Sequence, residues 1–440
     1  MTELKRDIGL IGATFIALNG VIGAAVFAMP QTLAEGAAGA SPYLILVFGA
    51  AMVFVALVFG ELAGRFDSAG GPVVYVDAAF GRFAGFQAGW LYYLARVASS
   101  AANTNVLLTY AATFAPGADQ GLVRLAAIAA IILLLVAINI AGVKGAVRTL
   151  NAVTVLKLAP LIALAAWGLA GFAATIPAPQ APAASGSVGE ISLVLLYAFV
   201  GFELATLTAG ETADAKRSLP RALVGVIVVG AIFYFLIQLA YVAIMQGAAP
   251  EGAPLAAAAR VLAGPAGAIA IAIAAIVSVS GNLFASMIAT PRITYAMALE
   301  GALPKWFAAV HQRFATPVNS ILVVGVVAGA LAMTGAFVQL AIMSALARMI
   351  IYLACTAARV KLRRDAPQPA KTLSGRALRI VAPTIAIALC IWAAAQAKSE
   401  AWAFLAAFAV VGAGLYAVGR WRRAASSPIY SAKDLPSGDT

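Results

Sequence analysis

The sequence predicts an all-α polytopic membrane protein with about twelve transmembrane helices. Hydrophobic residues make up 63% of its 440 residues, charged residues only 10%, and the mean hydropathy is +0.96. Soluble domains contain about 45–50% apolar and about 25% charged residues, so a soluble fold would not bury this much apolar surface. A bilayer core about 30 Å thick takes roughly 20 apolar residues per helix, and this chain is long enough for about twelve such helices with short connections.

Apolar runs between polar or Gly/Pro breaks locate these helices. The runs lie near residues 8–30, 41–65, 83–115, 122–140, 151–173, 191–212, 221–246, 264–299, 317–335, 337–360, 377–397 and 400–420. We expect helices because a chain in hydrocarbon must satisfy its own backbone hydrogen bonds, and the runs are too long for barrel strands. The polar residues 426–440 are expected to form a disordered cytoplasmic tail.

The net charge of +12 is distributed unevenly between the two sides of the predicted membrane protein. Most basic residues fall in loops on the side of the N-terminus, whereas Arg124, Arg260 and Lys398 lie on the other side. Cytoplasmic loops carry such an excess of Lys and Arg, so an even number of helices places both termini in the cytoplasm. The same distribution argues against nucleic acid as a partner and points to the lipid bilayer.

Cysteine and histidine indicate neither a metal site nor a cofactor. Cys355 and Cys390 both lie in predicted transmembrane helices without metal-ligand spacing, and the single histidine, His311, lies in a loop. The sequence contains no HExxH or GxSxG motif and no paired intramembrane aspartates. We therefore expect no cofactor, no metal and no catalytic residue, which argues against an enzyme.

Two predicted helices contain interruptions near their middle. The first contains NGVIGAAVFAMP at residues 19–30, and the sixth contains YAFVGFELATLTAGE at residues 197–211. Paired interrupted helices in two halves of a chain indicate an inverted-repeat transporter with a site at the membrane midplane. The alternative is that these glycines only allow close helix packing. The first interpretation predicts repeats over 8–173 and 191–360, followed by two further helices over 377–420.

Five motifs in a fixed order carry a resemblance to a known family. They are GAAVF followed by Pro30, GELAGRFDSAGGPVVYV at 60–76, GFELATLTAGETADAKRSLPRA at 201–222, PRITYAMALEGALPKWF at 291–307 and TPVNSI at 316–321. Over nearly its whole length the chain resembles the amino acid-polyamine-organocation (APC) superfamily, in particular its bacterial amino acid permeases. The resemblance implies two inverted repeats of five helices plus two helices, in the bacterial inner membrane. It also implies secondary transport of amino acids by alternating access.

The resemblance places the substrate between the two broken helices. Unwinding near Gly23, Ala24 and Ala25 would expose N–H groups at the positive end of a half-helix, which suits an α-carboxylate. Ala25 stands where the family often has a second glycine, so its Cβ would narrow the site. Carbonyl groups freed near Phe199, Val200 and Gly201 would accept hydrogen bonds from an α-ammonium group.

The side-chain pocket is expected to contain residues from four of the predicted helices. They are Val21, Ile22, Ser99, Ser100, Asn103, Tyr197, Phe199, Phe202, Asn282 and Ser286. Tyr197 either stacks over the substrate or is an ordinary packed aromatic residue. Because no carboxylate besides Glu203 is evident in this set, a neutral L-amino acid is favoured over arginine or a polyamine.

Charged residues inside the predicted helices suggest how transport is driven. An ammonium group within a membrane is unfavourable, so Lys157 is either functional or extends toward the cytoplasm. By the resemblance, Lys157 matches a lysine of proton-coupled and exchanging members that takes the place of a sodium ion, which argues against coupling to sodium. Of the two remaining modes, proton-coupled symport is the leading expectation. Glu203 is expected to pair with a cation or stay protonated in coupling or gating, or to hydrogen-bond the interrupted backbone. Arg96 and Arg348 are the other intramembrane cations, and their partners cannot be read from sequence.

Glu61 and Glu211 lie at cytoplasmic helix ends inside the shared motifs. They are expected to hold an inward gate closed against Arg65, Lys216 or Arg292, or else to be solvated. An amino acid exchanger, a cationic amino acid or polyamine permease, and a sensor that binds without transport remain open alternatives. The sequence does not predict an oligomeric state.

Overall fold

The computed structural model describes residues 8–66, 70–141, 158–178, 187–365 and 373–426. Over these ranges every named element is a helix, and an isolated bridge joins Ile8 to Thr212. Eight helical segments of the described chain are long and apolar enough to cross a membrane. The prediction of an all-helical chain with several helices able to cross a membrane is therefore confirmed, whereas the number of about twelve transmembrane helices and the inverted repeat stay predictions.

The helices follow the predicted apolar runs. They are α1 (Leu10–Val21), α2 (Ala25–Ala37), α3 (Ser41–Ala63), α4 (Pro72–Phe80), α5 (Arg82–Ala111), α6 (Gly121–Ala141), α8 (Leu158–Gly171), α9 (Ser187–Phe199), η3 (Phe202–Glu211), α10 (Ala215–Met245), α11 (Pro254–Leu299), α12 (Val318–Thr334), α13 (Phe337–Asp365), α14 (Leu373–Ala395) and α15 (Ser399–Ser426). Short 3-10 turns are η1 (Ala38–Ala40), η2 (Ala173–Thr175) and η4 (Lys305–Ala308).

Several helices extend a few residues beyond the predicted runs, and two elements differ more clearly. Helix α4 was not expected, and Gly81 with φ +88° separates it from α5. Helix α11 begins ten residues earlier than the predicted start at 264, at Pro254, and bends at Ala263 and Gly264, where Gly264 has φ +61°. A glycine tolerates this left-handed conformation, so a Gly-Pro break interrupts the helix without ending it.

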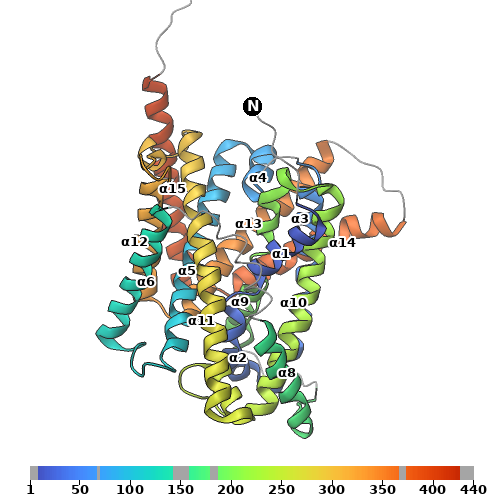
Figure 1. The fold of residues 1–440 in the computed structure, drawn as a ribbon. Coiled ribbons are helices and arrows are strands. Elements are labelled where there is room, and N and C mark those ends of the chain that lie inside the picture. The colour runs from blue at the N-terminus through green and yellow to red at the C-terminus, as the bar shows by residue number, and fades with distance from the viewer. Residues whose placement is uncertain (1–7, 67–69, 142–157, 179–186, 366–372, 427–440) are drawn as a thin grey trace, which may run out of the picture.

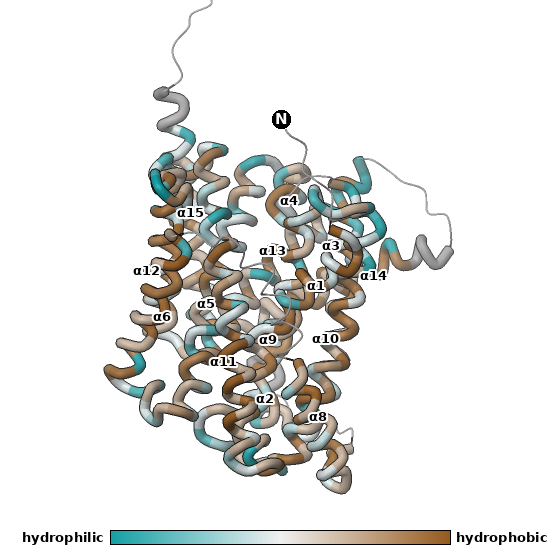
Figure 2. The backbone as a smooth tube through the Cα atoms, in the orientation of Figure 1, coloured by the Kyte–Doolittle hydropathy of each residue, from teal (hydrophilic) through white to brown (hydrophobic). Residues whose placement is uncertain are grey.

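The long helices stand side by side and enclose the segments that are broken (Figure 1). Helix α5 packs against α11 and α13 and is buried on most sides, so an apolar sequence with small residues suits it. Outer helices instead expose large apolar side chains, such as Leu133 of α6, Val326 of α12 and Val410 of α15. Hydrophobic residues cover the lengths of these helices and hydrophilic residues gather toward their ends (Figure 2). This pattern fits a lipid-facing surface.

Both predicted interruptions are present in the structure. Helix α1 ends at Val21 and α2 begins at Ala25, so residues 22–24 are not helical. Helix α9 ends at Phe199, and Gly201 has φ +103° before η3 begins at Phe202. The two breaks lie next to each other, because Gly20 and Gly201 are in backbone contact.

Substitution of Gly20 by Ala is expected to destabilise the protein. A Cβ on Gly20 would overlap with the Gly201 carbonyl group, which is backbone and cannot turn away. Overpacking of this kind costs about 1–3 kcal/mol. Thermal unfolding of the purified protein in detergent should show a lower Tm for Gly20→Ala. The control is Gly225→Ala in α10, where nothing lies within 4 Å of an added Cβ; equal Tm values for the two variants would contradict the close contact.

Candidate functional site

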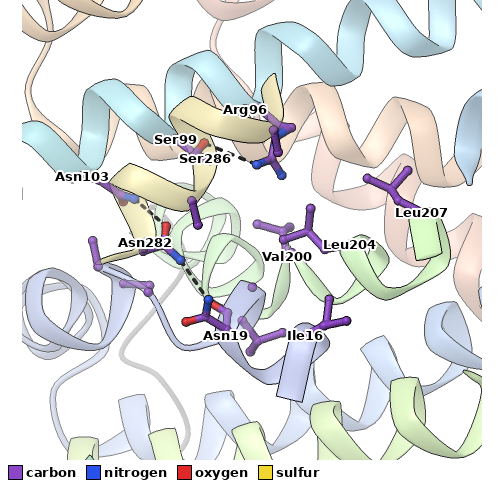
Figure 3. A pocket seen from close by; sticks show the side chains of 18 of the residues that line it. Ile16, Asn19, Arg96, Ser99, Asn103, Val200, Leu204, Leu207, Asn282 and Ser286 are labelled. Atoms are coloured by element: carbon purple, nitrogen blue, oxygen red, sulfur yellow. Dashed lines mark hydrogen bonds between the residues drawn. The ribbon is translucent and has the colours of Figure 1, made fainter. Parts of the chain in front are cut away.

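A cavity of about 380 Å³ lies at the two helix breaks. The α1–α2 and α9–η3 breaks form two of its walls, α5 and α11 form the others, and Arg348 of α13 also reaches it. Figure 3 shows Asn19, Asn103, Asn282, Arg96 and Ser286 around this space, with Val200 and Leu204 opposite Arg96. Cavities of this size hold small-molecule ligands.

Most of the binding residues expected from sequence lie on this cavity. Its lining includes Val21, Gly23, Ala24, Ala25, Ser99, Asn103, Tyr197, Val200, Gly201, Asn282 and Ser286. Four expected residues pack elsewhere: Ile22, Ser100, Phe199 and Phe202 are buried but do not line the cavity.

Three of these four residues contact identified neighbours. Phe202 packs edge-on against Phe59 and Phe199 packs against Tyr234. Ser100 hydrogen-bonds the hydroxyl of Ser286 at 2.9 Å and so lies behind the lining. Neighbouring residues of a helix point in directions about 100° apart, which is why proximity in sequence to a lining residue was a poor guide.

Sequence reasoning missed several lining residues that helical spacing would have found. They are Phe15, Ile16, Asn19, Gly20, Leu204, Leu207, Thr208, Ala285 and Ala289. On α11, for example, Asn282, Ala285, Ser286 and Ala289 follow the i, i+3, i+4, i+7 pattern of a single helix face. Once Asn282 is placed in the site, that pattern indicates the other three.

Three asparagines connect α1, α5 and α11 at one end of the cavity. The Asn103 amide donates to Asn282 Oδ1 at 2.8 Å, and the Asn282 amide donates to the Asn19 carbonyl oxygen at 3.0 Å (Figure 3). The hydroxyl of Tyr197 lies 3.5 Å from Asn103 Oδ1. This network holds Asn282 beside Gly23, where an added Cβ would meet the Asn282 amide nitrogen at 3.2 Å.

The N-terminus of α2 faces the same end of the cavity. Gly23, Ala24 and Ala25 all line it, and no side chain caps the helix at Ala24. The first amides of a helix have no partner within the helix and carry the positive end of its dipole. The opening therefore offers hydrogen-bond donors and a positive potential to an anionic group.

A buried ion pair lies next to the second break. Arg348 Nε contacts Glu203 Oε1 at 3.0 Å, and the two side chains are 4% and 0% exposed. Glu203 Oε2 also accepts hydrogen bonds from the Gly201 amide at 2.8 Å and the Tyr352 hydroxyl at 2.7 Å. Glu203 was expected either to pair with a cation or to hydrogen-bond the backbone at the break, and in the structure it does both.

The Arg348 guanidinium is satisfied by further acceptors. It donates to the Ala95 carbonyl oxygen at 3.3 Å, to Ser99 Oγ at 3.2 Å and to the hydroxyl of Ser344. A buried pair is stable only when its remaining donors and acceptors are also bonded. The network around Arg348 meets that requirement and ties α13 to α5 and to the α9–η3 break.

Arg96 is the second buried cation of the cavity and is 5% exposed. Its Nε donates to Thr290 Oγ1 at 3.1 Å and Nη2 lies 3.5 Å from Ser286 Oγ. Its guanidinium carbon lies 5.8 Å from the centre of the Tyr92 ring. In the part of the chain that the structure describes, no carboxylate forms an ion pair with Arg96.

The expected gate residues have partly different partners. Glu61 contacts Arg359 at 2.7 Å and Arg363 at 2.8 Å, and Arg65 more loosely at 3.8 Å. Of the expected partners, Arg65 is thus in contact with Glu61, whereas Arg292 is exposed and donates to the carbonyl group of Ile288 in its own helix. Glu61 has partners on α13 because the end of that helix, far away in sequence, packs beside the end of α3.

Glu211 and Lys157 are the other two charged residues expected to act in gating or coupling. Glu211 is exposed, and its backbone carbonyl accepts from the Ile8 amide at 3.0 Å. Lys157 lies outside the described residues.

Replacing Arg348 by Met should destabilise the protein by about 3–5 kcal/mol, because Glu203 would stay buried without its cation. Thermal unfolding of Arg348→Met, Glu203→Gln and the double variant forms a thermodynamic cycle, in which we expect the double variant to regain part of the loss. The control is Arg217→Met in an exposed pair with Asp214, which should change little. Additive losses in the double variant would show that Glu203 and Arg348 do not stabilise each other.

Comparisons with known proteins agree with this architecture. A family model described as amino acid permease matches residues 8–417. An uncharacterized transporter of Mycobacterium tuberculosis is 31% identical over 446 residues, covering 100% of this chain and 95% of the relative. The methylthioribose transporter of Bacillus subtilis is 26% identical over 435 residues, covering 94% and 93%.

A vacuolar cationic amino acid transporter of Arabidopsis thaliana is 29% identical over 178 residues, which cover 40% of this chain and 30% of the relative. These relatives are transporters rather than enzymes, and two of the three alignments extend over nearly the whole chain. Together with the family match, they show that the chain belongs to the amino acid permease family.

Proposed function

We propose that this protein is a secondary active transporter that moves an amino acid across the bacterial inner membrane by alternating access. The observation that carries the proposal is the cavity at the two helix breaks, with uncapped α2 amides on one wall and the α9–η3 break on another. A site between broken helices is accessible from either side when the surrounding helices move. The family match and the transporter relatives support the same class of function.

The backbone at the two breaks suits the zwitterion that all α-amino acids share. The α-carboxylate accepts hydrogen bonds from the amides near Ala24 and Ala25, at the positive end of α2. The α-ammonium group donates to backbone carbonyl oxygens near Val200, at the C-terminal end of α9, where the helix dipole is negative. Recognition by backbone leaves the side chains of the cavity free to select among amino acids.

Coupling to protons is the second part of the proposal. Lys157 is the residue that we assign to it, because its position in the sequence matches the lysine of proton-coupled and exchanging members of the family. Glu203 is bonded to Arg348, Tyr352 and the Gly201 amide, which favours a structural and gating role over proton transfer. The start of α1 and the end of α15 lie toward the same end of the molecule (Figure 1), which supports placement of both termini on one side of the membrane.

Uptake into proteoliposomes tests the function directly. Labelled amino acids should accumulate in empty vesicles when an inward proton gradient is imposed, since a symporter uses that gradient. Methylthioribose belongs in the same panel because one relative is named as its transporter.

Other results of the uptake experiment would indicate other functions. Uptake only into vesicles preloaded with an amino acid would make the protein an exchanger. Uptake of methylthioribose alone would replace the amino acid as substrate, and binding without uptake would indicate a sensor.

Gly23→Val should reduce amino acid binding and uptake by about tenfold or more. A branched side chain at Gly23 would project toward Asn282 and crowd the amides that receive the carboxylate. Binding is measured by titration calorimetry in detergent and compared with Gly225→Val, whose side chain enters open space in α10. Full affinity in Gly23→Val would move the substrate site away from this break.

A further inference from the structure

We infer that Arg96 gives the cavity a second anion-binding position, so that the preferred substrate is an acidic amino acid with two carboxylates. The inference rests on the proposed function and concerns the substrate side chain. It starts from the difference between the two arginines that line the cavity.

The two arginines have different partners although both are buried. Arg348 is neutralised by Glu203 at 3.0 Å and bonded to three further acceptors. Besides the face of the Tyr92 ring, Arg96 has two hydroxyl oxygens, one at 3.1 Å and one at the long distance of 3.5 Å, for five N–H donors. Hydroxyl groups satisfy donors but do not neutralise a charge.

An uncompensated guanidinium at this depth is unfavourable. Arg stays ionised in proteins, and burial of an ion removes several kcal/mol of hydration unless a counter-charge replaces it. An ionisable residue inside a transmembrane bundle therefore indicates a functional position, and its counter-charge has to be identified. The cavity is the space beside Arg96 from which such a partner can come, as Figure 3 shows.

The charges around the cavity favour an acidic amino acid over a cationic or a neutral one as the preferred substrate. Arg96 and Arg348 line it, no carboxylate is among the described lining residues, and Glu203 behind the wall offsets one arginine. A cationic side chain would be repelled by the remaining positive charge. A neutral side chain would leave Arg96 uncompensated, whereas a side-chain carboxylate neutralises it with a fork-like pair of hydrogen bonds.

The position of Arg96 along α5 separates it from the carboxylate site at the helix break. Asn103, which holds Asn282 beside Gly23, lies seven residues farther along α5, or about 10 Å at 1.5 Å per residue. The α-carboxylate at α2 and the side-chain carboxylate at Arg96 thus occupy opposite ends of the cavity. Between them the lining includes the small side chains of Ser99 and Ala285, which leave room for the methylene groups of aspartate or glutamate.

The test compares acidic amino acids with their neutral amides, which have nearly the same shape. L-glutamate, L-aspartate, L-glutamine and L-asparagine are titrated into the full-length protein in nanodiscs, and the same four are used in uptake assays. Loss of one partner of a buried charge pair corresponds to about thirtyfold or more in affinity. We therefore expect glutamate or aspartate to bind at least about thirtyfold more tightly than its amide.

Variants then assign the preference to Arg96. Arg96→Gln keeps hydrogen-bond donors but removes the charge, so the ratio of acid to amide affinity should fall to about one. Arg260→Gln removes the same charge from an exposed position of α11 and should leave the ratio high. If Arg96→Gln does not fold, Arg96→Lys serves instead: it keeps the charge but loses the planar fork, so the ratio should drop yet stay above one.

The outcomes separate this inference from the proposed function. Equal affinity for acids and amides in the native protein would overturn the inference and leave amino acid transport standing. A preference that persists in Arg96→Gln, or an unchanged ratio in Arg96→Lys, would overturn the role of Arg96. Absence of binding and uptake for all four compounds and for the rest of the panel would overturn the proposed function itself.

Discussion

Gly20 of α1 and Gly201 at the α9–η3 break are in direct backbone contact, and a Cβ on either residue would overlap with the carbonyl group of the other. This contact brings two interrupted helices together, although their breaks lie about 180 residues apart in the chain. Gly201 also has φ +103°. Glycine is therefore favoured at this position for two reasons: its positive φ and its close approach to Gly20. The cavity, the uncapped α2 amides and the Glu203 network are all arranged around it.

Interrupting a helix in a membrane leaves backbone groups without partners within the helix. The two breaks of this protein differ in what their amide groups face. At the α9–η3 break, the Gly201 amide is bonded by Glu203, which Arg348 and Tyr352 hold in place. At the α1–α2 break no side chain caps α2, so its first amides face the cavity. The Gly201 amide at the second break is thus satisfied by the protein, whereas the first amides of α2 are available to a ligand.

The two arginines on the cavity show the same division of roles. Arg348 belongs to a closed network that joins α5, α13 and the α9–η3 break, which explains why we expect its loss to affect stability. Arg96 has hydroxyl partners and an open neighbouring space, which explains why we expect its loss to affect selectivity. Arg96 and Asn103 lie seven positions apart on α5. Under these assignments, Arg96 binds the side-chain carboxylate of the substrate, and Asn103 supports the site of its α-carboxylate.

Local sequence determined the class of the protein, its helices and the positions of both breaks. Apolar runs mark helices because each segment must satisfy its own backbone hydrogen bonds in hydrocarbon. The stretches at residues 19–30 and 197–211 indicated where two of these runs are interrupted. The order of five motifs likewise indicated the family before any contact was known. In the candidate site, the expectations at Gly23, Asn103, Asn282 and Ser286 coincide with the cavity lining, because each lies at a break or on an inward helix face.

Only the tertiary structure decided which charges meet. The sequence contained Arg96 and Arg348 as equivalent intramembrane cations, and packing of α13 against α5 and the α9–η3 break gave Glu203 to Arg348 alone. In the same way, packing of the ends of α3 and α13 gave Glu61 to Arg359 and Arg363 instead of Arg292. Hydropathy and helix breaks are properties of neighbouring residues, whereas ion pairs depend on the rotation and depth of helices that lie hundreds of residues apart.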